Sequence, residues 1–462
     1  MVSCIVCGKG FYTNYNLKRH TLQVHEKKYS HQCPDCSKKF AQPSDLKRHK
    51  DSVHSAEKIS TSAENSAAVL ENSTTVPENS TTVPENSDDD LEKISLPPKE
   101  SESAFQKVLF TDYDMLLFIE NGVRGGISQC CNRYAIANNK YMPNFNPDDE
   151  IKYLMYLDAN NLYGYAMSKY LPLKDFVWSD NNLTTQDILN LSDESDVGYI
   201  LEVDLDYPPD LHDKHSDFPL APENKPPPNC KEPRLLTTLE PKTKYVLHYS
   251  NLKLYLKLGL ILKKIHHVLK FFQSPWLKNY IDYNTKLRTK AFLNDFQKDF
   301  YKLMNNSIFG KTMENVRRRV DIRLCSTEEQ ARKLIAKSNF NRRTIFSENL
   351  MAVHLKKTNI KFFKPIHVGM TILDLSKVLM YSFHYEYMKH RYDSKIKLMY
   401  TDTDSFIYEI KTDDFYSDMK DDLNLYDTSD YDKNNVYNLP LVNKKVIGKM
   451  KDENKGNIMT EY

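Results

Sequence analysis

The segment that most constrains this chain is the run Tyr400-Thr-Asp-Thr-Asp-Ser405. Apolar, β-prone residues precede it at 396–399 and follow it at 406–408, and two such stretches around a short polar turn predict a β-hairpin. The turn carries two carboxylates, Asp402 and Asp404, and like charges held this close need a counter-charge. A divalent cation that prefers oxygen ligands, such as magnesium, manganese or calcium, would supply it. The simpler alternative is an exposed acidic turn that binds nothing.

Two further segments favour a functional site over an exposed acidic turn. The first is the apolar stretch Tyr153–Leu157, which predicts a strand, ends at Asp158 and is followed by Tyr163. The second is the segment 302–311, with the sequence KLMNNSIFGK. Three short patterns in this order are far more specific than any one of them alone.

Together these segments resemble motifs A, B and C of family B DNA polymerases. They are most similar to the protein-primed branch of bacteriophages, linear plasmids and Polinton/Maverick transposons. That branch carries Asp-x-x-Ser-Leu-Tyr-Pro, Lys-x-x-x-Asn-Ser-x-Tyr-Gly and Tyr-x-Asp-Thr-Asp-Ser; here Gly164 replaces the proline and Phe309 the second tyrosine. The segment Arg124-Gly125-Gly126 resembles the Tyr-x-Gly-Gly signature of the branch, without its tyrosine.

The resemblance implies a role for each matching residue. Asp158 and Asp404 would bind two catalytic Mg²⁺ ions, for which Mn²⁺ can substitute, and Asp402 would assist as a third catalytic residue. Tyr163 would exclude the 2′-hydroxyl of a ribonucleotide. The remaining contacts to the incoming nucleotide would come from Lys298, Lys302, Asn306 and Phe309. The contacts to DNA would come from Arg124, Gly125, Gly126, Ser307 and Gly310.

The resemblance extends over residues 105–462 and implies an α+β fold, with a palm built on an antiparallel sheet and a fingers region. A helical pattern at 276–306 would place Lys290, Lys298 and Lys302 on one face of a single helix. Arg317-Arg-Arg319 is expected to follow template phosphates or to act as a nuclear-import patch. The region between motifs A and B is expected to be loop-rich in places and to hold the insertion that contacts the terminal protein and primer. We expect the exonuclease and thumb to be missing and the core to be truncated at its C-terminal end.

Residues 1–55 contain two copies of one cysteine and histidine pattern. The spacings of the two copies are identical and suit two tetrahedral zinc ions, so the pattern is that of two ββα C2H2 zinc fingers. The eight predicted zinc ligands are Cys4, Cys7, His20, His25, Cys33, Cys36, His49 and His54. Arg19 and Arg48 occupy helix positions from which a finger can contact guanine. The alternative is that the fingers contact protein or RNA.

Residues 56–104 are expected to form a disordered linker. The repeats at 71–77 and 78–84 are rich in serine, threonine and proline, and an acidic run follows at 88–90. Of the eight cysteines of the chain, four stand at zinc spacing and the other four are scattered, which indicates a reducing compartment. The sequence has neither an apolar run long enough to span a membrane nor a signal peptide, so we expect no membrane partner and a nuclear location.

Two functions are compatible with these observations. The first is a DNA-directed DNA polymerase that uses a DNA template-primer, deoxynucleoside triphosphates and a terminal priming protein. The second is a non-catalytic, transposon-derived DNA-binding protein that carries zinc fingers and an incomplete polymerase domain. Intact Asp158, Asp402, Asp404 and Lys302 favour the first function.

The doubled zinc pattern yields a direct prediction. Cys33→Ser removes one ligand of the second finger, whose folding free energy comes from the metal, so this finger should unfold while the first remains folded. Metal analysis of the purified chain should give two zinc ions, and the variant should give one. A well-folded parent chain with fewer than two zinc ions would contradict the assignment.

Overall fold

The computed structural model describes residues 2–3, 10–11, 31–33, 39–40, 112–180, 182–289 and 294–462. The chain divides into two units, residues 1–94 and 95–462, and the boundary falls within the segment expected to be a linker. The predictions for Cys4, Cys7, His20, His25, Cys36, His49, His54, Arg19, Arg48 and Lys290 lie outside the described residues.

The first unit contains two short antiparallel hairpins with the same register. One pairs β1 (Val2–Ser3) with β2 (Gly10–Phe11), and the other pairs β3 (His31–Gln32) with β4 (Lys39–Phe40). Val2 lies opposite Phe11, and His31 lies opposite Phe40 at the equivalent positions of the second copy. A hairpin at the start of each cysteine and histidine pattern is the ββ part of a ββα finger. Cys33, the one predicted zinc ligand described, is buried.

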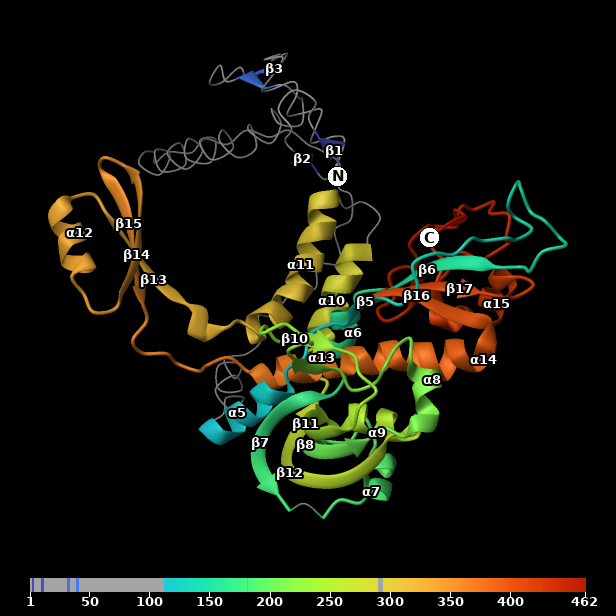
Figure 1. Cartoon of the computed structure of the whole chain (residues 1–462), viewed down its shortest axis with the longest axis horizontal. Coiled ribbons are helices and arrows are strands. Elements are labelled where there is room, and N and C mark those ends of the chain that lie inside the picture. Colours follow the sequence, from blue (N-terminus) through green and yellow to red (C-terminus); the bar gives the residue numbers. More distant parts are fainter. Residues whose placement is uncertain are drawn as a thin grey trace, which may run out of the picture. The chain divides into compact units, whose positions relative to one another are not determined.

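A six-stranded sheet in the second unit contains the strands of the first and third motifs (right in Figure 1). Its strands in spatial order are β18 (Tyr426–Asp427), β19 (Met450–Asp452), β6 (Tyr153–Ala159), β17 (Ser405–Ile410), β16 (Ile396–Asp402) and β5 (Ser128–Cys130). All neighbours are antiparallel except β18 and β19. The strand predicted at 153–157 and the hairpin predicted at 396–408 are therefore confirmed, and they are adjacent in this sheet.

Both faces of this sheet are covered, which explains why β17 is buried at every position. On one face, Phe406 and Tyr408 stack on aromatic side chains of Phe383 and His384. On the other face, Ile407 packs in a cluster with Ala135 and Met142. A strand buried on both faces is expected to contain a continuous apolar run, as this strand does at 406–408.

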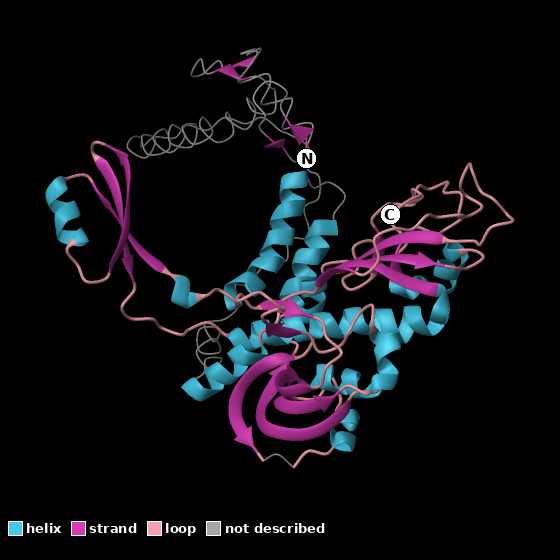
Figure 2. Cartoon of the chain, viewed as in Figure 1, coloured by secondary structure: helices cyan, strands magenta, loops and turns pink. Residues whose placement is uncertain are grey.

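A second, four-stranded antiparallel sheet occupies much of the region between Gly164 and Lys302, where loops were expected in places. Its strands in spatial order are β11 (Lys242–His248), β8 (Val197–Asp206), β12 (Ile261–Ser274) and β7 (Leu171–Ser179). The strands β7 and β12 are long and strongly curved (Figure 2). The proline-rich part of the region forms the small hairpin of β9 (Glu223–Lys225) and β10 (Arg234–Leu236). Around this sheet lie α7 (Thr185–Asn190), η3 (Pro209–Leu211), α8 (His212–His215) and α9 (Tyr249–Lys257).

The prediction of a single helix over 276–306 is wrong. The structure has two helices, α10 (Lys278–Thr289) and α11 (Asp295–Thr312), which pack side by side (Figure 1). The reason is local, because Asn294 caps the start of α11. The Asn294 side chain accepts from the backbone amide of Gln297, and the Gln297 side chain accepts from the backbone amide of Asn294. Lys298 and Lys302 therefore both lie on α11, one turn apart.

The buried helix α13 (Ile366–Tyr381) contacts β7 and β11 of the four-stranded sheet. The π-helical segment η5 (Ser382–Lys389) continues it and packs on the six-stranded sheet. A smaller module follows α11. It pairs β13 (Val320–Cys325), β15 (Leu350–Lys356) and β14 (Phe340–Ser347), with α12 (Glu328–Ile335) on one face. The remaining elements are α5 (Tyr113–Gly122), α6 (Leu162–Met167), η4 (Val316–Arg318), α14 (His390–Tyr392), η6 (Asp393–Lys395), α15 (Phe415–Asp421) and η7 (Leu423–Leu425). Within the described residues, we find no helix with both the length and the apolar character needed to cross a bilayer.

Candidate active site

The central strands of the six-stranded sheet bring the motif carboxylates together. Asp158 on β6 lies opposite Ser405 on β17, and Asp402 lies opposite Ser405 across the hairpin. The amide of Ala159 donates to the carbonyl of Asp404 over 2.7 Å, which places Asp404 at the end of β6. Residues far apart in the sequence, Asp158 and Asp404, are thus neighbours because their strands pair.

The turn that carries Asp404 rests on the loop before β5. Thr403 adopts a left-handed conformation with φ 58°, and its amide donates to the carbonyl of Ile127 over 2.8 Å. A Cβ on Gly126 would lie 2.6 Å from Cγ2 of Thr403, so only glycine allows this close approach. The match to Arg124-Gly125-Gly126 therefore has a structural basis at Gly126, which supports the turn directly. Gly125 has open space around it.

A cavity of about 480 Å³ opens beside Asp158 and Asp404. Its lining combines carboxylates, cationic side chains and amides from both sheet and helices. The lining residues are Asp158, Asn160, Asn161, Leu162, Tyr163, Arg288, Lys302, Asn306, Thr403, Asp404, Lys451 and Glu453. Asp402 is exposed and does not line the cavity; its carboxylate accepts from the hydroxyls of Tyr400 and Thr403, each at 3.4 Å.

Burial makes this cavity unfavourable for negative charge. It raises the pKa of Asp158 to about 7, with further increases from the charges of Asp404 and Glu453 and decreases from Lys451 and Lys302. Burial also raises the pKa of Asp404, and the Asp402 charge adds to that effect. Two neighbouring carboxylates that resist ionisation are stabilised as anions when a cation binds between them.

The donor atoms around Asp158 and Asp404 suit a hard divalent cation. The two side chains offer carboxylate oxygens, the ligands that Mg²⁺ prefers, and Mg²⁺ commonly takes one or two protein carboxylates and completes its shell with phosphate oxygens and water. In the part of the chain that the structure describes, no three histidine, cysteine or acidic side chains are grouped to form an all-protein metal site. The pair therefore fits a metal that arrives with, or is completed by, a phosphate ligand.

Three cationic side chains from three different elements face this carboxylate pair. Lys302 comes from α11, Arg288 from α10 and Lys451 from β19, where it lies directly opposite Asp158. The Arg288 Nε is buried and has no hydrogen-bond partner among the described residues. Lys298 does not line the cavity and pairs with Asp295 at 3.1 Å. Among the predicted nucleotide-binding lysines, only Lys302 thus reaches the cavity.

Sequence reasoning missed four residues that line the cavity: Asn160, Arg288, Lys451 and Glu453. The segment 448–453 reaches the site because Asn160 pairs with it: the Asn160 amide donates to the carbonyl of Lys449 over 2.9 Å, and the Asn160 carbonyl accepts from Gly448 over 2.8 Å. The Asn160 side chain is held by the buried carboxylate of Asp427 at 2.6 Å. The sequence offered one indication that this segment could contribute to a site. A lysine and a glutamate stand two residues apart, at 451 and 453, and alternate residues of an extended chain share a face.

Aromatic side chains of the first two motifs form one wall of the site. The rings of Tyr163 and Phe309 lie 4.4 Å apart and are tilted by 33°. Asn161, in a left-handed conformation, caps α6 and so sets where Tyr163 projects. Asn306 lines the cavity next to them, with its Oδ1 buried and unpartnered among the described residues. Ser307 and Gly310 are exposed on α11 and lie outside the lining.

The structure does not support a DNA contact by the side chain of Arg124. This arginine is buried, its guanidinium donates to the carbonyl of Val246 over 2.6 Å, and the guanidinium lies 3.7 Å from the ring centroid of Tyr245. Sequence alone gave no indication of this, because the partners lie on β11, far along the chain. The arginine run at 317–319 is also partly engaged: Arg317 pairs with Glu120, and Arg319 pairs with Glu314 at 2.6 Å.

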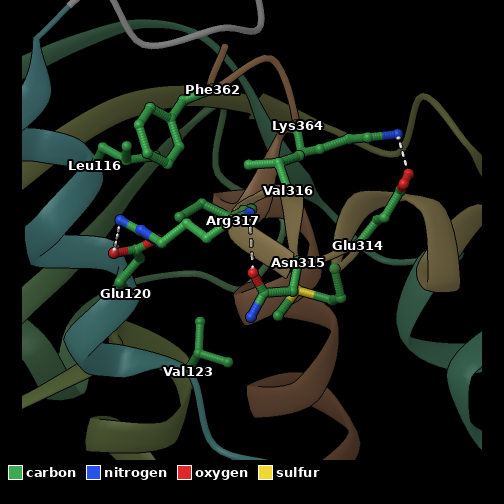
Figure 3. Close-up of a pocket in the computed structure, with 11 residues that line it drawn as sticks. Leu116, Glu120, Val123, Glu314, Asn315, Val316, Arg317, Phe362 and Lys364 are labelled. Carbon is green, nitrogen blue, oxygen red and sulfur yellow. Dashed lines mark hydrogen bonds and ion pairs between the residues drawn. The ribbon is translucent and has the colours of Figure 1, made fainter. Parts of the chain in front are cut away.

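A second cavity, of about 250 Å³, lies between α5 and the segments that lead into and out of the β13–β15 module (Figure 3). Its charged groups neutralise one another: Arg317 pairs with Glu120 and lies over Phe362, and Lys364 pairs with Glu314 at 2.8 Å. Unlike the first cavity, it contains no cluster of like charges that calls for a ligand. The cavity at Asp158 and Asp404 is therefore the candidate active site.

Comparison with known families agrees with this geometry. Residues 53–389 match the family of DNA polymerase type B, organellar and viral, and residues 3–25 and 31–54 each match the C2H2 zinc finger. The first match includes Asp158, Tyr163 and Lys302 and ends before the hairpin that carries Asp404. No curated protein matches the sequence.

Solved structures of phage phi29 DNA polymerase are similar to part of the chain. The ternary complex with primer-template DNA and incoming nucleotides has 17% identity over 69% of this chain and 47% of the phage chain, with a TM-score of 0.44. An orthorhombic crystal form has 16% identity over 77% of this chain and 52% of the phage chain, with the same TM-score of 0.44. The chain thus spans about half the length of these phage polymerase structures.

Proposed function

Because the chain belongs to the family of organellar and viral type B DNA polymerases and carries two C2H2 zinc fingers, we propose that it is a DNA-directed DNA polymerase of the protein-primed type. It adds deoxynucleotides to a primer 3′-hydroxyl as a DNA template directs. The observation that carries this proposal is the cavity where Asp158 and Asp404 meet Lys302, Arg288 and Lys451. Anionic groups beside cationic groups match a ligand that combines divalent metal with triphosphate.

Asp158 and Asp404 would hold two Mg²⁺ ions, for which Mn²⁺ can substitute, and Asp402 would assist from the exposed side of the turn. When bound, such ions activate the attacking hydroxyl and stabilise the charge of the leaving pyrophosphate. The two side chains contribute their full negative charge only when a cation offsets their burial and mutual repulsion. The carboxylate pair is therefore arranged to act together with metal and nucleotide.

The cationic wall would bind the triphosphate. Lys302, Arg288 and Lys451 reach the cavity from α11, α10 and β19, so they surround a phosphate chain from several directions. Fixed positive charge in a partly buried site stabilises negative charge that develops on the leaving group. Lys298 lies one turn before Lys302, and release from Asp295 would let it join them.

The aromatic wall would select the sugar and support the base. Tyr163 occupies the cavity with its ring packed on Phe309, so it cannot easily withdraw, and a 2′-hydroxyl would collide with it. Asn306 offers a buried amide oxygen to the nascent base pair. Ser307 and Gly310, exposed on the same helix, would contact the template strand together with Gly125 and Gly126.

The proposal includes partners outside this cavity. The zinc fingers, through Arg19 and Arg48, would assist in binding DNA, and two structural Zn²⁺ ions would hold them folded. The four-stranded sheet lies where the protein-primed branch has the insertion that contacts a terminal priming protein, so that protein is the expected third partner. A nuclear location is part of the same proposal. The competing function is a DNA-binding protein without catalysis.

Sugar selection provides one test. Tyr163→Val should raise ribonucleotide incorporation relative to deoxynucleotide incorporation by roughly 10- to 200-fold, the range expected when a pocket stops rejecting one small group. Single-nucleotide extension with matched ribo- and deoxynucleotides measures this ratio. Tyr165→Val on the same helix is the control, since Tyr165 does not line the cavity. The steric role is wrong if both incorporations fall together at a constant ratio.

Metal binding provides the second test. Asp404→Asn keeps the shape of the side chain but removes its charge. The extension rate should fall by about 10³-fold, because a lost metal ligand removes several kcal/mol of transition-state stabilisation. Binding of duplex DNA should be retained or strengthened, because a negative charge near the phosphates is gone.

The control for this variant is Asp175→Asn. Asp175 is an exposed carboxylate with a left-handed φ of 56°, a conformation that asparagine also tolerates. The Asp175→Asn variant should extend the primer at the rate of the parent. Equal extension by Asp404→Asn and its parent would refute the metal assignment. Absence of extension by the parent itself, with DNA binding intact, would favour the non-catalytic function.

A further inference from the structure

The turn that carries Asp404 is supported by a buried lysine that no sequence motif identified. Lys377 lies on α13 and is almost fully buried. Its Nζ donates to the carbonyl of Arg124 over 2.8 Å and to the carbonyl of Leu373, on its own helix, over 3.2 Å. A buried ammonium is costly unless it is hydrogen-bonded, so this contact has a large effect on the Arg124 backbone.

The backbone that Lys377 holds is the same segment that supports the catalytic turn. From Arg124 the chain passes through Gly126, which packs against the Thr403 side chain, to Ile127, whose carbonyl accepts from the Thr403 amide. It then enters β5, where Ser128 pairs with Asp402. A displacement at Arg124 would therefore be transmitted to Thr403 within three residues.

The surroundings of Lys377 show that it is held in one place. The carboxylate of Asp374, also buried and one turn earlier on α13, accepts from the amide of His248 over 2.9 Å. Burial lowers the pKa of Lys377 to about 8, while the charge of Asp374 opposes that decrease. A void of only about 20 Å³ lies between Lys377, Gly126, Tyr163 and Thr403, so the lysine is directly behind the active-site wall.

We propose that Lys377 is a positioning residue of the catalytic turn: it fixes the segment 124–127 on which Thr403 rests and so sets the position of Asp404. The side chain of Arg124 acts in the same way from the other side, since it ties this segment to the carbonyl of Val246 on β11. Lys377 touches neither the cavity nor any reacting group. As far as catalysis is concerned, the inference rests on the proposed polymerase function.

Lys377→Met keeps the length of the side chain but removes the donor. In the full chain, amide hydrogen exchange should accelerate by about tenfold or more in peptides covering 122–130 and 398–408, as expected when a hydrogen bond from a charged donor is lost. Peptides from β14 and β15 should be unchanged. In primer extension, kcat should fall while KM for the nucleotide changes less than about twofold, because the triphosphate-binding cations stay in place.

Lys253→Met is the matched control. Lys253 also donates to a backbone carbonyl, that of Leu191 over 2.7 Å, but on α9, away from the turn. The Lys253→Met variant should leave amide hydrogen exchange at 398–408 unchanged. Uniformly faster exchange in Lys377→Met, or unchanged exchange at 398–408, would overturn the inference.

Gly126→Ala tests the same path without a change of buried charge. The added Cβ would displace the Thr403 side chain, so exchange at 398–408 should again accelerate, and kcat should again fall. This variant keeps the inference testable if Lys377→Met does not fold, and unchanged exchange in it would contradict the inference. If the parent extends no primer, the proposed function fails, whereas the exchange experiment still decides whether Lys377 positions the turn.

Discussion

The candidate active site is built around one unfavourable arrangement: two partly buried carboxylates, those of Asp158 and Asp404, lie close together. Neither charge is favoured where it lies, since burial raises the pKa of both groups. The charges of Asp404 and Glu453 add to this effect at Asp158, and those of Asp402 and Glu453 add to it at Asp404. The neighbouring strands hold them there because β17 is buried along its whole length and pairs with β6 residue by residue. The packing of the sheet thus stabilises an arrangement that the charges alone would oppose.

The arrangement of cations follows from the same constraint. Lys302 and Lys451 lower the cost of ionising Asp158, and they come from α11 and β19. Lys451 is also paired with Glu453 at 3.3 Å, whereas neither Asp158 nor Asp404 has a salt bridge among the described residues. The second cavity is the contrast, because there Glu120 and Glu314 are each matched by arginine or lysine. Carboxylates without a salt-bridge partner among the described residues therefore distinguish the first cavity, where a metal–phosphate ligand would bind.

Much of this site could be predicted from local sequence. The strands at 153–157 and 396–408 are encoded by apolar runs and a polar turn, so the meeting of Asp158 with Asp404 follows once the two strands pair. The hairpins of the first unit also follow from the doubled cysteine and histidine pattern. These features depend on neighbours in the sequence, which is why pattern reasoning reaches them.

Other features were missed, one because a helical periodicity conceals a local helix cap and the rest because they depend on contacts between distant segments. The break between α10 and α11 results from a cap at Asn294 that a helical periodicity conceals, and with it Arg288 enters the site on a separate helix. Arg124 resembled an exposed basic residue but is buried by β11, more than a hundred residues away. Lys451 and Glu453 reach the cavity only because Asn160 and Asp427 pair with the segment around them. The interactions that pattern reasoning missed are mostly long-range.

The most direct test of the account is template-directed extension by the purified full chain. Four primer-templates that differ only in the templating base would each be offered all four deoxynucleotides with Mg²⁺, and a parallel set would contain a chelator. The account predicts that each template directs addition of its complementary deoxynucleotide and that chelation abolishes addition. Addition that ignores the templating base, or no addition by a folded chain that binds the DNA, would contradict it.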